Sequence, residues 1–291
     1  MSSLSILKIL RPWQWIKNTV VFTVFIGAGL TSTHEFINLT YSFLGMCLIA
    51  SAGYIINDFA DKKMDALHPH KKNRPIADGS ITTLNAVLLM LTLLTTGLFV
   101  LIQINFSVLV LGILYFLISI SYTYFLKYKK YVDSLSITIL FLLRAYIGSQ
   151  TINVDISIYL FLFITTSSLM VSISKKISIL SNTEVKHVYK NYLMEKYDVK
   201  NLVYLFNVLS ISSLIIYSSW LFGKLENFYF LNFILLFLSG FSLNQTFKTI
   251  LKNSLDSKME DISKDFFQNQ VILINILIVA CLTFYIIYIN N

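Results

Sequence analysis

Long apolar runs separated by short polar gaps dominate this sequence. Nine runs are long enough to cross a membrane as helices: residues 15–31, 39–57, 81–102, 106–126, 133–150, 156–174, 202–222, 228–247 and 269–289. The gaps on the outer side are too short to form a separate domain, and no convincing internal repeat is present. The pattern predicts an all-α fold, a polytopic bundle of about nine transmembrane helices forming one domain over residues 1–291.

The composition supports this interpretation. Of 291 residues, 56% are hydrophobic and only 13% are charged, whereas charged residues make up about 25% of a soluble domain. The net charge of +8 does not predict nucleic-acid binding, because the basic residues cluster in short gaps and not on a solvated basic face. Cys47 and Cys281 fall inside apolar runs, so we expect neither a disulfide nor a metal pair.

The basic residues also predict the orientation. All Lys and Arg residues except Lys224 and Arg144 lie at the amino end (Lys8, Arg11 and Lys17) or in the gaps after the second, fourth, sixth and eighth runs. By the positive-inside rule, the amino terminus and the charged loops are cytoplasmic and the carboxyl terminus is outside. The first run is too long for a cleavable signal peptide and lacks a cleavage site. We therefore expect a multi-pass protein of the cell (inner) membrane, with an active-site cavity open to the cytoplasm and membrane lipids around it.

The strongest chemical signal follows the second run. Asp58, Asp61 and Asp65 are spaced three and four residues apart, which places them on one face of a helix. Three acids on one stripe repel each other unless a cation lies between them, and oxygen ligands without nearby Cys favour Mg²⁺, which shares its coordination with phosphate oxygens. The alternative interpretation of the three aspartates is a helix end whose charges are solvated and bind no metal. Basic residues that can contact phosphate follow: His68, Lys71, Lys72 and Arg74.

Two further residues have more than one interpretation. His68 could bind metal or act as a general acid, but a helix-ending turn before Pro69 is favoured, with a phosphate contact compatible with either. Arg144 lies deep in the fifth run, where a charge costs about 3 kcal/mol or more and needs a partner in the bundle interior. Asp133 lies on the same helix face, about 16 Å away. A second interpretation also stays open, in which Arg144 has a purely structural role and donates hydrogen bonds to carbonyl groups.

Several stretches resemble a known family. The motif Asn57-Asp58-x-x-Asp61-x-x-x-Asp65 after the second run resembles the UbiA superfamily of intramembrane prenyltransferases. Four stretches resemble its decaprenyl-phosphate phosphoribosyltransferase branch: Arg11-Pro12-x-Gln14-Trp15-x-Lys17-Asn18; Asp65-Ala66-x-His68-Pro69 through Lys71 to Arg74-Pro75-Ile76-Ala77-x-Gly79; Tyr122 with Leu126-Lys127 and Asp133; and Leu143-Arg144-Ala145 with Gly148. The branch has a Lys-Arg pair where this chain has Lys175-Lys176.

The resemblance implies an activity: transfer of 5-phosphoribose from 5-phosphoribosyl 1-diphosphate to a polyprenyl phosphate, with Mg²⁺ held by Asp58, Asp61 and Asp65. It implies phosphate-holding roles for Lys71, Arg74, Lys127 and Arg144, of which Arg144 is a catalytic candidate, and a role for Lys17 where the lipid head group enters. The other substrate-site candidates are Asn57, His68, Tyr122, Asp133, Lys175 and Lys176.

Two rival functions remain. A UbiA-type prenyltransferase acting on a prenyl diphosphate and an aromatic acceptor predicts a second acidic cluster after the sixth run, where the only acid between Ser174 and Tyr192 is Glu184. A transporter predicts ionisable residues deep in several runs, where this chain has Arg144 alone. The sequence is compatible with a homo-oligomer but does not determine the oligomeric state. It also does not determine the roles of Asp261 and Asp265.

Overall fold

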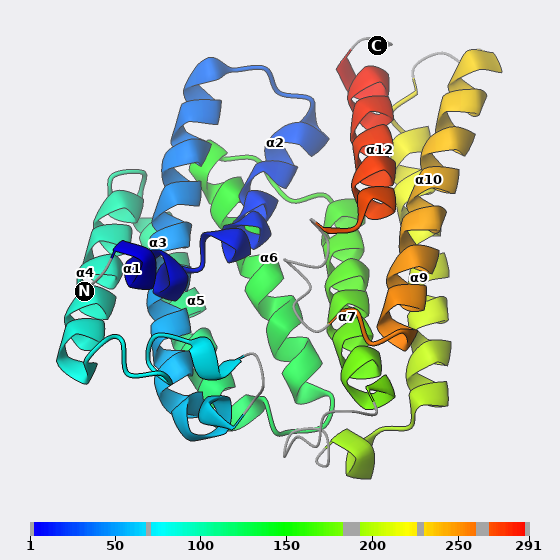
Figure 1. Cartoon of the computed structure of the whole chain (residues 1–291). Helices are drawn as coiled ribbons and strands as arrows, with labels where there is room; N and C mark the ends of the chain where they lie inside the picture. The colour runs from blue at the N-terminus through cyan, green and yellow to red at the C-terminus, as the bar shows by residue number, and fades with distance from the viewer. Residues whose placement is uncertain (1–2, 68–70, 183–192, 226–229, 260–267, 289–291) are drawn as a thin grey trace. The chain divides into compact units, whose positions relative to one another are not determined.

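The described part of the chain is helical throughout. The computed structural model describes residues 3–67, 71–182, 193–225, 230–259 and 268–288, and these ranges contain helices and turns without any strand. The chain divides into two compact units, residues 1–156 and 157–291. The predicted all-α fold is therefore confirmed for the described residues (Figure 1).

Eight helices are long and apolar enough to span a membrane within these ranges. They are α3 (Thr33–Ala66), α4 (Thr83–Ile102), α5 (Phe106–Ser121) with its extension η3 (Tyr122–Leu126), α6 (Val132–Ile152), α7 (Ile158–Ser181), α9 (Val199–Phe222), α10 (Phe230–Leu255) and α12 (Gln270–Tyr288). Each overlaps one of the predicted runs. The protein is thus an integral membrane protein, as predicted from composition.

Short polar residues start four of these helices. Ser32, Thr82, Asn105 and Ser157 each accept a hydrogen bond from the backbone N–H three residues later, at distances of 2.8–3.4 Å. Such N-caps satisfy one of the backbone donors that a helix start leaves unpaired. The caps explain why these helices begin at the polar gaps between the runs.

The first predicted run is not one α-helix, so that expectation was wrong in detail. It forms the 3₁₀-helix η1 (Pro12–Phe22) followed by the short α2 (Thr23–Ala28), and α1 (Ser3–Leu10) precedes them. Arg11 adopts a left-handed conformation before Pro12 and interrupts the helix between α1 and η1. A 3₁₀-helix rises about 2 Å per residue, so η1 and α2 together have a contour of about 30 Å, the thickness of the hydrocarbon core.

Close backbone contacts pack the first unit. A Cβ on Gly97 of α4 would lie 2.9 Å from the carbonyl oxygen of Gly45 of α3, so the two helices pack with little between their backbones. The core between α3 and α4 is apolar and includes Ile55 and Leu93. The helix η1 packs on α3 and α6. The segment runs along α3, with Trp15 bonded to Ser51 and the ring of Phe22 against that of Phe36.

The second unit packs its four long helices around a separate apolar core. Phe206 and Leu221 of α9 are buried there with Ile177 of α7 and Ile272 of α12. Lys176 of α7 is also buried, with 4% of its surface exposed. Its charge is accommodated by Tyr197, whose hydroxyl lies 3.2 Å from Nζ and whose ring centroid lies 4.5 Å away.

Candidate functional site

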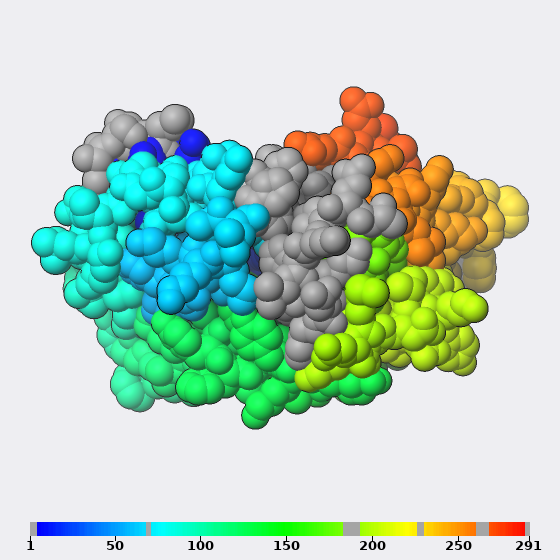
Figure 2. Space-filling view, turned by 60° about the horizontal axis from the view of Figure 1, so that its bottom comes forward, coloured from blue at the N-terminus to red at the C-terminus, as the bar shows by residue number. Residues whose placement is uncertain are grey.

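The acidic motif lies on the last turns of α3. This helix continues beyond the apolar run to Ala66, so Asp58, Asp61 and Asp65 all belong to it, as the spacing predicts. In Figure 2 the end of α3, the cyan segment that follows it and the turn between α5 and α6 form one face of the first unit. The polar site described below lies at this face.

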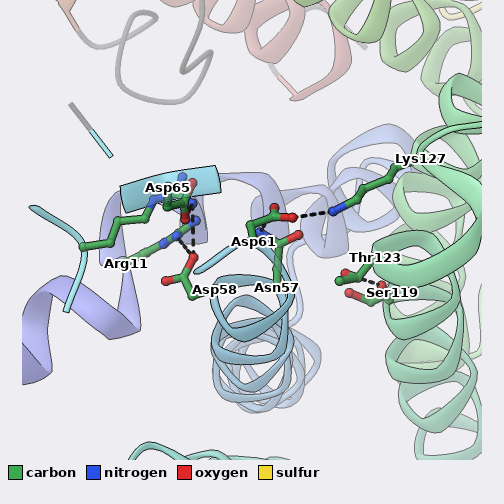
Figure 3. A network of polar contacts seen from close by, with 9 residues as sticks. Arg11, Asn57, Asp58, Asp61, Asp65, Ser119, Thr123 and Lys127 are labelled. Atoms are coloured by element: carbon green, nitrogen blue, oxygen red, sulfur yellow. Dashed lines mark hydrogen bonds and ion pairs between the residues drawn. The ribbon is translucent and has the colours of Figure 1, made fainter. Parts of the chain in front are cut away.

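Two of the aspartates share basic partners on one side of α3 (Figure 3). Asp58 is 1% exposed and its Oδ1 accepts from the guanidinium of Arg11 and, at 3.3 Å, from Nη1 of Arg74. The same Nη1 of Arg74 lies 2.5 Å from Oδ2 of Asp65, which is 4% exposed. Each of these buried carboxylates is therefore paired with at least one cation, which its burial requires.

Asp61 has a different partner, on the side of α3 that faces α5 (Figure 3). Its Oδ1 lies 2.5 Å from Nζ of Lys127, and its Oδ2 accepts from the amide of Asn57 at 3.2 Å. Lys127 follows a π-helical turn, η3, in which the N–H of Lys127 donates to the carbonyl of Tyr122 five residues earlier. Single π turns occur often at functional sites, and this one brings Lys127 to Asp61.

The segment after α3 is fixed by its own hydrogen bonds. The N–H of Arg74 donates to the carbonyl of Lys71 at 3.0 Å, and the N–H of Asp78 donates to the carbonyl of Arg74 at 2.9 Å. Ile76 and Ile81 are buried in the core that α3 and α4 share. These contacts hold Arg74 between two aspartates. His68 lies outside the described residues.

Arg11 is the site residue that the sequence analysis did not select. It is a non-glycine residue at φ 52°, ψ 59°, a costly left-handed conformation that persists only where surrounding contacts hold it. Besides its ion pair with Asp58, its guanidinium lies 5.4 Å from the ring centroid of Tyr54. The available signal was its position in the stretch from Arg11 to Asn18 that carries the family resemblance.

The three aspartates can also be tested against a divalent cation. The described residues contain no group of three His, Cys, Asp or Glu side chains gathered around one point. However, Oδ2 of Asp58 is buried and accepts no hydrogen bond. A buried carboxylate oxygen without a donor is costly, and an oxygen-preferring cation would satisfy it. The donor set, carboxylates with the Asn57 amide beside them, fits Mg²⁺.

Two other predicted residues lie near the acidic helix end. Tyr122 begins the π turn η3, which ends just before Lys127, the partner of Asp61. Asp133, in the first turn of α6, is 3% exposed. That Tyr122 and Asp133 belong to the same site as the acidic motif stays a prediction.

The remaining candidates lie elsewhere. Lys17 is half-buried on η1, and its Nζ donates to Oε1 of Gln14 at 2.5 Å. Lys175 and Lys176 belong to α7 in the second unit, where Lys175 is exposed. Lys71 lies in the 3₁₀ turn η2 (Lys71–Asn73). The substrate roles of all four stay predictions.

The hydrogen-bond partners of Arg144 are uncharged groups. Its Nε donates to Oδ1 of Asn18 at 2.8 Å, its Nη1 to the carbonyl of Leu140 at 2.8 Å and its Nη2 to the hydroxyl of Tyr115 at 2.6 Å. Arg144 is 4% exposed. This arrangement favours the structural alternative that the sequence left open.

The fold and the site together define a polytopic helical membrane protein with a cluster of alternating acidic and basic side chains at one helix end. The profile of the UbiA prenyltransferase family matches residues 20–271, which is most of the chain and runs through both units. The protein belongs to the UbiA prenyltransferase family and is an enzyme of that family.

Individual relatives and structures agree with this assignment. The decaprenyl-phosphate phosphoribosyltransferase of Mycolicibacterium smegmatis is 25% identical over 224 residues, which cover 75% of this chain and 70% of the relative. The uncharacterized protein y4nM of Sinorhizobium fredii is 32% identical over 168 residues, 57% of this chain but only 33% of y4nM. The structure of a UbiA homologue from Archaeoglobus fulgidus bound to GPP and Mg²⁺ superposes with a TM-score of 0.64 at 15% identity, covering 97% of this chain and 98% of that one.

Proposed function

We propose that this protein transfers 5-phosphoribose from 5-phosphoribosyl 1-diphosphate to a polyprenyl phosphate and releases diphosphate. The observation that carries the proposal is the pairing of Asp58, Asp61 and Asp65 with Arg11, Arg74 and Lys127. A metal ion bound to the carboxylates would leave three cations for phosphate groups. A donor with a 5-phosphate in addition to its diphosphate uses more cations than a prenyl diphosphate does. The relatives named as decaprenyl-phosphate phosphoribosyltransferases support the same donor.

The residues have separate tasks in this reaction. Asp58, Asp61 and Asp65 would hold Mg²⁺, which neutralises charge on the leaving diphosphate. Arg74 and Lys127, with Lys71 from the neighbouring 3₁₀ turn, hold phosphate oxygens and so orient C1 of the ribose. An oxygen of the lipid phosphate forms the new bond to C1 while the bond from C1 to the diphosphate oxygen breaks, and the diphosphate leaves with the electron pair. The nucleophile is already an anion, so no protein base is needed.

The proposal also includes the orientation of the protein in the membrane and its domain organisation. We retain the predicted cytoplasmic position of the charged helix end, from which the soluble donor would enter, while the lipid acceptor arrives laterally from the bilayer. We also retain the interpretation of residues 1–291 as one UbiA-like domain, which the fold match over 97% of the chain supports. Lys17, Lys175 and Lys176 remain proposed contacts to anionic groups of the substrates.

The test is a two-donor assay on detergent-purified protein with Mg²⁺. One arm supplies 5-phosphoribosyl 1-diphosphate and a polyprenyl phosphate; the other supplies a prenyl diphosphate and 4-hydroxybenzoate. We expect diphosphate release and a phosphoribosylated lipid in the first arm alone. Product in the second arm alone would assign the protein as an aromatic prenyltransferase, and the absence of product in the first arm would contradict the proposal.

A further inference from the structure

The buried Arg144 makes contacts in several directions at once. Its hydrogen bonds reach η1 through Asn18, α5 through Tyr115 and its own helix through Leu140. Its guanidinium also lies over the rings of Tyr115 and Phe141, at 4.7 and 5.0 Å from the centroids. Within the described ranges Arg144 forms no ion pair with an acid. Its charge is stabilised by oriented dipoles and aromatic faces, which demand one fixed side-chain geometry.

Asn18 extends this contact to a third long helix. It is fully buried on η1, and while its Oδ1 accepts from Arg144, its Nδ2 donates to Sγ of Cys47 on α3 at 3.3 Å. A buried amide must have its polar atoms satisfied, so its position is determined by both partners. Arg144 and Asn18 together therefore tie η1 to α3, α5 and α6.

A backbone contact lies one turn further along α6. A Cβ added to Gly148 would be 2.0 Å from the carbonyl oxygen of Val21, so η1 lies directly on the backbone of α6. This contact requires glycine. Arg144 and Gly148 are four residues apart on one face of α6, and they hold η1 with a side chain and a bare backbone respectively.

The other end of η1 carries Arg11. Ser51 of α3 donates to the carbonyl of Leu10 at 2.8 Å and accepts from Nε1 of Trp15 at 3.0 Å, so the turn around Arg11 is held against α3. Arg11 keeps its left-handed conformation in this turn and reaches Asp58 from it. The position of Arg11 thus depends on the docking of η1.

We infer that Arg144 is a positioning residue: it docks η1 onto α3, α5 and α6 and thereby holds Arg11 at Asp58. It does not contact the substrate. The effect of Arg144 on turnover rests on the proposed function, whereas its effect on η1 does not. The two consequences can therefore be measured separately.

The structural consequence is tested by hydrogen exchange of the purified full-length protein, followed by mass spectrometry. Arg144→Lys removes the planar guanidinium, whose nitrogens donate to Asn18, Leu140 and Tyr115. Tyr115→Phe removes one acceptor hydroxyl but keeps the aromatic ring. Gly240→Ala is the control, since its Cβ would meet its nearest neighbour at an ordinary 3.7 Å. In both test variants we expect exchange in residues 12–22 to rise by about tenfold or more, with α4 and α9 unchanged. Wild-type exchange of η1 in Tyr115→Phe and in any folded Arg144→Lys protein would overturn the inference.

The functional consequence is tested by a double-mutant cycle. Arg144→Lys alone should lower kcat/KM by about tenfold, but in an Arg11→Ala background it should lower it by less than about twofold further, because the residue it positions is gone. Independent, multiplicative losses would indicate that Arg144 acts on substrate directly and would overturn the inference. If the wild-type protein releases no diphosphate from 5-phosphoribosyl 1-diphosphate, the proposed function fails, and the exchange measurement still decides the role of Arg144.

Discussion

Replacing Asp61 with asparagine removes a charge from the site without changing the size of the side chain. The Asp61 side chain is 23% exposed, and that of its partner Lys127 is 12% exposed. The introduced amide oxygen can still accept a hydrogen bond from Lys127, so we expect a loss of about 1 kcal/mol or less in the free energy of unfolding. Since domains are stable by about 5–15 kcal/mol, the variant stays folded.

Turnover should respond much more strongly. If Asp61 helps to hold the cation that stabilises the leaving diphosphate, its charge acts in the transition state. Removing one preorganised electrostatic group costs about 10²–10³ in kcat, or roughly 3–4 kcal/mol of activation free energy. This is several times the expected loss of stability, so unfolding cannot account for it.

The assay measures diphosphate release by Asp61→Asn at saturating donor and acceptor over a series of Mg²⁺ concentrations, together with thermal unfolding in the same detergent. Asp155→Asn is the matched control, because Asp155 is exposed between α6 and α7. We expect a loss of about a hundredfold or more and a higher Mg²⁺ requirement. Turnover within about threefold of wild type, in a protein that melts normally, would refute the metal role of Asp61.

Three further predictions test the site and the packing. Arg74→Met leaves Asp58 and Asp65, 1% and 4% exposed, without the cation between them. We expect about 3–5 kcal/mol of destabilisation, which added Mg²⁺ should partly reverse in thermal unfolding. A melting temperature of this variant that does not change with Mg²⁺ concentration would contradict the cation site. Gly97→Ala should lower the unfolding free energy by about 1–3 kcal/mol, because its Cβ would lie 2.9 Å from a backbone oxygen of α3, and Gly240→Ala should not. Chelation by EDTA should abolish turnover and excess Mg²⁺ restore it; activity that persists after chelation would remove the metal from the mechanism.

Much of the fold could be predicted from the sequence because membrane helices follow from local composition. A run of about 18 apolar residues has few alternatives in a bilayer, and eight such runs are helices in the structure. The acidic motif could be predicted for a similar reason. The helical spacing holds, since α3 extends far enough to include Asp65. However, Asp58 and Asp65 share Arg74 while Asp61 pairs with Lys127 on another side of the helix, so the gathering of all three around one cation stays a prediction.

Partners distant in sequence could not be predicted in this way. Arg144 bonds to Asn18, which is 126 residues away, and Arg11 bonds to Asp58, which is 47 residues away. Periodicity says nothing about such pairs, because they depend on how helices meet. The 3₁₀ geometry of η1 was also missed, since an apolar run of that length reads as an α-helix. Its buried Asn18, an amide inside an apolar run, was the available signal of a close contact.

The π turn after α5 has a consequence for chain length. It accommodates one residue more than an α-helix would between Ser121 and Lys127. Deleting a single residue from 122–126 would return this stretch to ordinary helical winding and leave the residues after it in about the same orientation. Deleting a residue inside α5 would instead rotate everything after it by about 100° and turn the ammonium group of Lys127 away from Asp61, although no side chain of the site had been altered. A one-residue deletion should therefore be tolerated better at this turn than inside α5.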